Sequence, residues 1–170
     1  YLLDTIGMPE TEYEAFLHYK EMKDKYDYMQ GFNCESKKDI AKTLAVFAGF
    51  TEGLQLFASF AIMLNFPRHN KMKGMGQIIS WSVRDESLHC ESMIKLFRTF
   101  VSENPEIWTA EFQREIYVAC STVVEHEDAF INLSFELGPA EGLTAAEVKE
   151  YIRFIADRRL SQLGLQPIYR

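Results

Sequence analysis

The chain has 170 residues, with 47% hydrophobic and 25% charged residues and a formal net charge of −7. Its length and composition are those of an ordinary globular protein of one domain, and the acidic balance argues against a nucleic-acid-binding surface. Three widely spaced cysteines, Cys34, Cys90 and Cys120, form no CxxC motif. They indicate reduced thiols in a cytoplasmic protein rather than a disulfide framework or a zinc site.

Every element predicted along the chain is a helix. Residues 1–7 read as the end of a helix that stops at a glycine, without a preceding N-cap. The chain is therefore expected to be a fragment of something longer. A polar helix is predicted from Pro9 to Asp27 or Tyr28, and a loop follows from Gly31 to Ser36.

A long apolar helix is predicted from residue 37 or 39 to Asn65, where Pro67 stops it. Gly49 and Gly53 lie inside it, and each costs about 0.5–1 kcal/mol relative to alanine. A close helix contact or a local distortion would explain them. The most apolar stretch, residues 54–66, is too short and too polar for a membrane span and reads as a buried helix.

Three further helices are predicted, at Met75–Ser102, Pro105–Leu137 and Ala145–Leu163. Thr144 and Glu147 form a capping box at the start of the last helix, and Gly164 ends it. Long helices joined by short loops imply antiparallel neighbours in a bundle. The prediction is therefore an all-α fold, with residues 1–170 forming a single helical domain.

Glu86 and His89 lie three residues apart within residues 83–89 (VRDESLH), so they share one face of a helix. A Glu-x-x-His motif that faces inward is what a carboxylate-bridged metal pair requires of one helix. The alternative is a surface glutamate and an unrelated histidine. Apolar neighbours predict a mostly buried helix, which favours the metal; they are Ile78, Ile79, Val83, Leu88, Ile94 and Leu96.

Glu52 is an isolated carboxylate among aromatic and aliphatic residues, so it requires a cation. The cation is either a metal ion or Arg84 on a neighbouring helix. One glutamate and one Glu-x-x-His make half of a di-iron carboxylate site. No second Glu-x-x-His exists, because Glu14 and His18 read as a solvated pair and residues 125–128 (EHED) as a solvated charge run.

Other polar and aromatic residues have simpler readings. Asp85 points about 100° away from Glu86 on the helix, and it could accept a hydrogen bond from a ligand histidine. Arg84 is either its counter-ion or a surface charge. The remaining expectations are an exposed His69, core or interface packing for Trp81 and Trp108, and a solvated face, rather than a phosphate site, for Arg153, Arg158 and Arg159.

Three stretches together resemble the small (beta) subunit of class I ribonucleotide reductase. They are residues 51–60 (TEGLQLFASF), residues 83–89, and residues 151–160 (YIRFIADRRL) followed by Gly164 and Leu165. The resemblance extends along essentially the whole chain and corresponds to the carboxyl-terminal half to two thirds of that subunit.

The resemblance implies a ferritin-like helical homodimer that works with a large (alpha) subunit. Its oxygen-reactive dinuclear centre, di-iron or with manganese, generates a radical that the large subunit uses to make deoxyribonucleotides. By this resemblance, Glu52, Glu86 and His89 match three of the six metal ligands. Asp85 and Arg84 match the radical-transfer region, and Leu56 and Phe60 match the apolar wall around the radical.

The same resemblance places several of the family's parts outside the chain. The first acidic ligand and the first Glu-x-x-His would precede residue 1, and the tail that docks on the large subunit would follow Arg170. Neither Tyr1 nor Tyr169 is assigned a radical role. The fragment alone is therefore expected to be inactive, and metal-free or only partly occupied.

Three alternatives remain open at this stage. Two chains could assemble one site across a two-fold axis, since together they supply two glutamates and two Glu-x-x-His motifs. The protein could be another di-iron carboxylate oxidase or hydroxylase. It could also be a metal-free helical interaction module.

Overall fold

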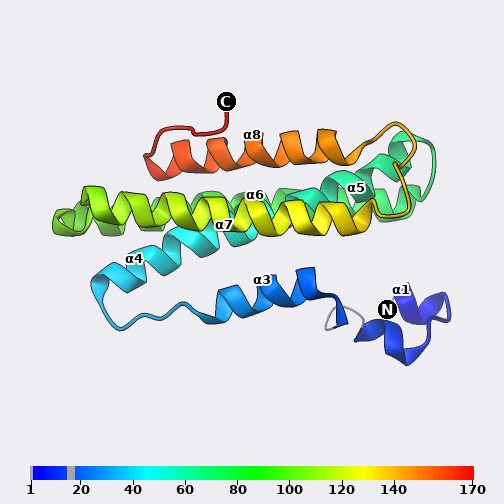
Figure 1. Ribbon diagram of the computed structural model, residues 1–170, viewed down its shortest axis with the longest axis horizontal. Helices are drawn as coiled ribbons and strands as arrows, with labels where there is room; N and C mark the ends of the chain where they lie inside the picture. The colour runs from blue at the N-terminus through cyan, green and yellow to red at the C-terminus, as the bar shows by residue number, and fades with distance from the viewer. Residues whose placement is uncertain (1, 15–17) are drawn as a thin grey trace. The chain divides into compact units, whose positions relative to one another are not determined.

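The computed structural model describes residues 2–14 and 18–170 and divides into two compact units, residues 1–32 and 33–170, each described here by itself. The first unit holds α1 (Leu2–Thr5), the 3₁₀-helix η1 (Glu10–Tyr13) and α3 (Lys20–Gln30) (Figure 1). Gly7, at φ 72°, follows the end of α1 as predicted.

The single helix predicted from Pro9 to Asp27 or Tyr28 is wrong. The 3₁₀-helix ends at Tyr13, and Tyr19 is extended (φ −87°, ψ 119°) before α3 begins. Residues 15–17 of that prediction lie outside the described residues. Neither η1 nor α3 buries a residue, so no packing stabilises a longer helix of this polar sequence.

The second unit begins with three consecutive helical segments: α4 (Lys37–Val46), the π-helix η2 (Phe47–Gln55) and α5 (Phe57–Arg68). Ser36 and Asp39 form a capping box at the predicted start. The predicted stop at Asn65 is wrong by three residues, because α5 includes Pro67 in its last turn. A proline so near the end of a helix removes only one backbone hydrogen bond.

The two glycines inside this segment lie in η2, and both predicted explanations are found. The helix is distorted, and its backbone is closely approached. A Cβ on Gly49 would lie 3.1 Å from Leu163 Cδ1, and one on Gly53 would lie 2.7 Å from Arg159 Nε. A larger residue at position 53 would therefore displace the packed neighbour.

The remaining elements are α6 (Lys73–Glu103), the 3₁₀-helix η3 (Pro105–Ile107), α7 (Ala110–Ser134) and α8 (Ala145–Leu163). The helix predicted from Pro105 to Leu137 is wrong at both ends. Thr109 is extended and its hydroxyl accepts a hydrogen bond from the Phe112 N–H, so α7 starts there. The capping box at Thr144 and the αL end at Gly164 are confirmed for α8.

The helices of the second unit pack with antiparallel neighbours (Figure 1). The π-helix η2 contacts α6, α7 and α8 and so lies at the centre of this packing. Its Phe50 and Leu54 are fully buried with Phe97, Phe112 and Ile116. The described residues include no strand beyond one isolated bridge between Ala140 and Leu143, and the all-α prediction is confirmed.

Helix α6 is less buried than its apolar sequence predicts. Within it, only Gly76, Cys90, Ile94 and Phe97 are buried. Ile78, Trp81, Leu88 and Leu96 are exposed, so the prediction of a mostly buried helix is wrong within this chain. Trp81 is not part of the core, and its packing at an interface stays a prediction. The reason is geometric: one face of α6 meets the other helices, and the opposite face also carries apolar side chains. Trp108 does pack, edge to face, against Phe97 and Phe112.

Residues 37–68 are long and apolar enough to cross a membrane by length and composition alone. Half of the most apolar window is nevertheless buried inside the protein, against the other helices. The central position of η2 explains this composition, because the core helix of a globular bundle has the same character.

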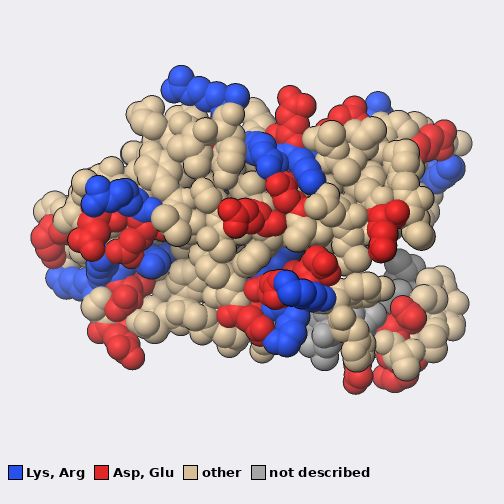
Figure 2. Space-filling model, in the orientation of Figure 1, with Lys and Arg blue, Asp and Glu red and all other residues tan. Residues whose placement is uncertain are grey.

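Charged side chains of both signs are interspersed on the face drawn in Figure 2. Ion pairs also join helices: Glu115 of α7 pairs with Lys38 and Lys42 of α4, at nitrogen–oxygen distances of 2.5 and 3.0 Å. The Lys38 hydrogen bond is the main reason that the pKa of Glu115 is lowered. Because these groups are partly exposed to solvent, the two pairs contribute little to stability.

The three cysteines are free, and the fold makes them chemically unequal. Cys34 is exposed, whereas Cys90 and Cys120 are buried. Burial raises the pKa of Cys90, and it raises that of Cys120 to about 12.

We expect one thiol per chain to react with Ellman's reagent at pH 8 in the native protein and all three after denaturation. Fast reaction of a Cys34→Ser variant would contradict this packing.

Candidate metal centre

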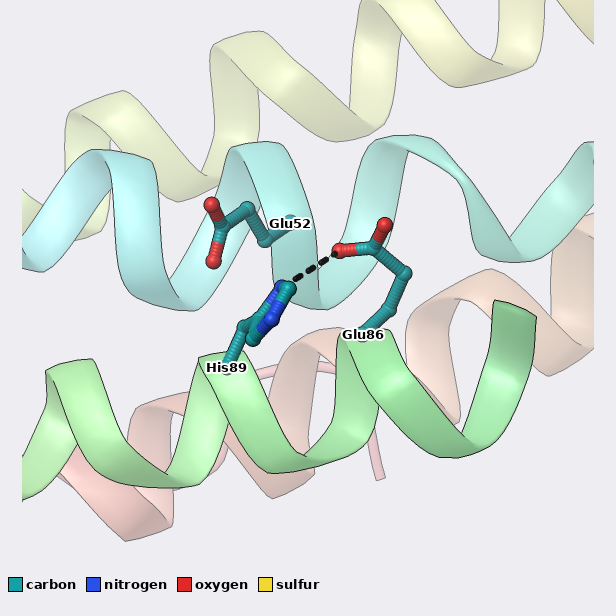
Figure 3. Close-up of side chains that lie close together, drawn as sticks. All are labelled: Glu52, Glu86 and His89. Carbon is teal, nitrogen blue, oxygen red and sulfur yellow. Dashed lines mark ion pairs between the residues drawn. The ribbon is translucent and has the colours of Figure 1, made fainter. Parts of the chain in front are cut away.

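Glu52 is carried by the π-helix η2, which is otherwise one of the most buried segments of the chain. Its neighbours Phe50, Gly53 and Leu54 face the core, and the Glu52 side chain extends toward α6 (Figure 3). The carboxylate oxygen Oε2 is buried and has no hydrogen-bond partner among the described residues. A buried acceptor without a partner costs about 1–3 kcal/mol, and more when it is charged.

Glu86 and His89 lie one turn apart on α6 and face the same side of that helix, as their spacing predicts (Figure 3). His89 Nδ1 lies 3.7 Å from Glu86 Oε2. The Glu86 side chain is 26% exposed and that of His89 is 60% exposed. The pair therefore stands at the border between the core and the solvent-facing side of α6.

The structure brings Glu52 together with this pair. One ligand atom from each of Glu52, Glu86 and His89 lies within 4.8 Å of the other two. Two carboxylate oxygens and an imidazole nitrogen are suitable donors for iron or manganese. A cation between them would also compensate the buried Glu52 oxygen, so these residues fit a divalent metal ion.

Asp85 and Arg84 are not part of this group. Arg84 Nε lies 3.7 Å from Asp85 Oδ1, and both side chains are well exposed. Arg84 thus pairs with Asp85, as expected if it is the counter-ion of that carboxylate. The alternative in which Arg84 is the cation for Glu52 is not found.

Leu56 and Phe60, predicted to share an apolar wall, differ in their surroundings. Phe60 is buried and lines a cavity of about 240 Å³ with Phe57, Val83 and Tyr151, whereas Leu56 is exposed. The turn between them is regular, since the Phe60 N–H donates to the Leu56 carbonyl at 3.0 Å. The difference therefore lies in what covers each side chain, and other helices cover Phe60 but not Leu56.

Arg159 was predicted to lie on a solvated face, and this prediction is wrong. Its side chain is 4% exposed, and its Nε donates to the Gly53 carbonyl at 2.9 Å. Burial lowers the pKa of Arg159. The sequence did hold a signal, since Arg159 follows Ile155 and precedes Leu163 by four residues each, on the buried face of α8.

Other polar residues also depart from their predicted places. Glu127 is fully buried, so the charge run at residues 125–128 is not a solvated face throughout. It lies four residues from both Val123 and Ile131 on the buried face of α7.

Arg153 forms a bidentate pair with Asp128, at 3.0 and 2.6 Å. His69, expected to be exposed, is half-buried, and its Nδ1 lies 3.4 Å from Glu141.

Comparison with known proteins gives a consistent result. The family described as "Ribonucleotide reductase, small chain" matches residues 1–170. The "Probable ribonucleoside-diphosphate reductase small subunit 376L" of Invertebrate iridescent virus 6 is 42% identical, over 99% of this chain and 57% of its own length. The "Ribonucleoside-diphosphate reductase subunit beta" of Chlamydia pneumoniae is 31% identical, over 99% and 52%. The chain thus spans about half the length of these relatives.

Solved structures show the same fold. The ribonucleotide reductase R2 subunit from Clostridium botulinum has a TM-score of 0.88 at 22% identity, over 99% of this chain and 55% of that one. A putative class I ribonucleotide reductase from Bacillus halodurans has a TM-score of 0.85 at 22% identity, over 94% and 53%. The predicted ferritin-like helical fold is confirmed.

The unpartnered oxygen of Glu52 predicts a conflict between stability and metal binding. Glu52→Met removes a partly buried charge and keeps the side chain's length. We expect it to raise the free energy of unfolding of the metal-free chain by about 1 kcal/mol. Urea denaturation in the presence of EDTA measures this.

The matched control is Asp85→Asn, which changes an exposed carboxylate and should leave the free energy of unfolding within about 0.5 kcal/mol. A destabilised Glu52→Met chain would show that the carboxylate has a stabilising partner in the metal-free protein.

Proposed function

Because this chain belongs to the ribonucleotide reductase small-chain family, we propose that it carries one side of the dinuclear metal centre of a ribonucleoside-diphosphate reductase small subunit. The whole subunit would supply the oxidising centre with which ribonucleotides are converted to deoxyribonucleotides. The convergence of Glu52, Glu86 and His89 from η2 and α6 supports this assignment most directly.

These three residues would hold the metal. Bound iron or manganese would supply oxygen activation and one-electron oxidation at this position. Glu52 and Glu86 contribute anionic oxygens, which balance the charge of a divalent ion, and His89 contributes a neutral nitrogen when it is deprotonated. Glu52 Oε2 is shielded from solvent, so it does not have to lose a hydration shell when a metal binds.

We assign supporting roles to four neighbouring residues. Asp85, beside Glu86, would accept a hydrogen bond from a ligand on another segment and take part in radical transfer, with Arg84 as its counter-ion. Phe60 would keep water from the apolar side of the centre, because it is buried among aromatic side chains. Leu56 would contribute to the same wall from the exposed end of η2.

Two protein partners follow from the family: a large subunit and a second copy of the small subunit. The exposed apolar residues of α6 support protein contacts in the whole subunit, since Ile78, Trp81, Leu88 and Leu96 are more apolar surface than one helix normally presents to solvent. Three free thiols support a reducing compartment, and we place the protein in the cytoplasm.

A chimaera tests the proposed function. The 170 residues replace the matching stretch of the iridescent virus 6 small subunit, which is 42% identical. We expect the chimaera, supplied with Fe(II) and that virus's large subunit, to reduce a ribonucleoside diphosphate. His89→Ala in the chimaera should lower the rate by about 10- to 100-fold or more, because a metal ligand is lost.

The control is Ile78→Ala, which changes an exposed residue of α6 outside the metal group and should keep iron content unchanged. A chimaera that is folded and dimeric but binds no iron would contradict the proposed function. So would full activity of the His89→Ala chimaera.

A further inference from the structure

We infer that Arg159 is a positioning residue that fixes the π-helical backbone of η2 and thereby aims Glu52 at Glu86 and His89. The inference rests on the proposed function for its consequence, metal binding. Its structural basis is independent of any metal, and it starts from the location of the guanidinium.

Arg159 lies on the core-facing side of α8, in register with Ile152, Ile155 and Leu163. A guanidinium is rarely placed there, since a buried charge is costly unless it is paired and hydrogen-bonded. Its hydrogen bonds go to an amide and a main-chain carbonyl rather than to a carboxylate. Nη1 donates to Gln162 Oε1 at 2.8 Å, and Nε donates to the Gly53 carbonyl at 2.9 Å.

The Gly53 carbonyl stands where the helical hydrogen-bond pattern is interrupted. At the end of η2 the Leu56 N–H bonds to the Leu54 carbonyl, two residues back, whereas Phe60 bonds normally to Leu56 in the next turn. A junction of this kind is where a side-chain donor can fix the backbone, because buried backbone groups are nearly always paired. Arg159 gives the Gly53 carbonyl such a donor from a different helix.

The guanidinium of Arg159 can approach the Gly53 backbone because position 53 has no side chain. A Cβ at position 53 would lie 2.7 Å from Arg159 Nε and 2.8 Å from Cys90 Sγ. The absence of a side chain at Gly53 therefore permits the guanidinium to reach the backbone. On its other side the guanidinium carbon lies 5.4 Å from the ring centre of Phe57, the first residue of α5. Arg159 thus contacts both the π-helix and the start of the α-helix that follows.

The register of η2 matters because Glu52 lies inside it, directly before Gly53. A π-turn contains one residue more than an α-turn, so it rotates the preceding and following residues by about 100° relative to a continuous α-helix. Return to α-helical register would turn Glu52 away from α6 or move Phe57 and Phe60 out of the core. The three ligand atoms, now within 4.8 Å of one another, would then no longer meet.

The test compares Arg159→Met with Arg153→Met. Arg153 is a matched control because it lies on the same helix, but its guanidinium pairs with Asp128 of α7. Hydrogen–deuterium exchange of the metal-free chain gives the structural readout. We expect Arg159→Met to speed exchange in residues 50–57 about tenfold while α7 stays protected. Arg153→Met should leave residues 50–57 unchanged.

Co(II) titration, followed by its visible absorption, gives the functional readout. We expect Arg159→Met to weaken Co(II) binding about tenfold or more and to change the band shape, and Arg153→Met to do neither. Arg159→Gln, which keeps a polar side chain but is too short to hold both hydrogen bonds, should act in the same direction and serves if Arg159→Met does not fold.

Two results would overturn the inference. One is faster exchange spread equally over all helices in Arg159→Met, which would mark a general loss of stability. The other is Co(II) affinity and band shape that match those of Arg153→Met. If the unaltered chain binds no Co(II), the proposed metal site fails, and the exchange of residues 50–57 still decides whether Arg159 holds η2.

Discussion

The candidate site depends on one carboxylate, Glu52, placed in the most central helical segment of the bundle. Burying its oxygen without a hydrogen-bond partner is unfavourable in the metal-free chain. That cost is tolerable only if the group has a task that an apolar side chain cannot perform. The surrounding structure is consistent with such a task, since it brings Glu86 and His89 of α6 to the same point. The site is therefore a place in the core where a carboxylate replaces apolar packing.

The position of Glu52 depends on a distorted helix. The π-helix η2 carries Glu52, and its contacts come from three sides, with α6, α7 and α8 all packed against it. Gly49 allows Leu163 to approach closely, and Gly53 allows Arg159 to reach the backbone. Both contacts originate on α8, so the helix that contributes no ligand still shapes the ligand-bearing segment. Apolar packing stabilises this part of the core, and a few polar contacts within it set the orientation of the Glu52 side chain.

The sequence predicts much of this arrangement and misses a definable part. The helix start at Thr144 follows from local capping chemistry, and the three site residues follow from their isolation or their spacing. The register of η2 was not predictable, because periodicity arguments assume 3.6 residues per turn, whereas a π-helical turn contains one residue more. Arg159 and Glu127 were missed for another reason. They were predicted to face solvent because they are charged. Their positions in the apolar repeats of α7 and α8, however, place them in the core.

The error for α6 is the reverse. Four of its apolar residues were expected in the core but face solvent in this chain: Ile78, Trp81, Leu88 and Leu96. An amphipathic pattern shows which residues seek burial, but it does not show which partner covers them. The central claim concerns the border of this exposed surface, where Glu86 and His89 meet Glu52. Anomalous diffraction from crystals of this chain grown with Mn(II) tests it most directly. The account predicts a manganese peak coordinated by Glu52, Glu86 and His89 together. Manganese bound elsewhere, with these three side chains uncoordinated, would contradict it.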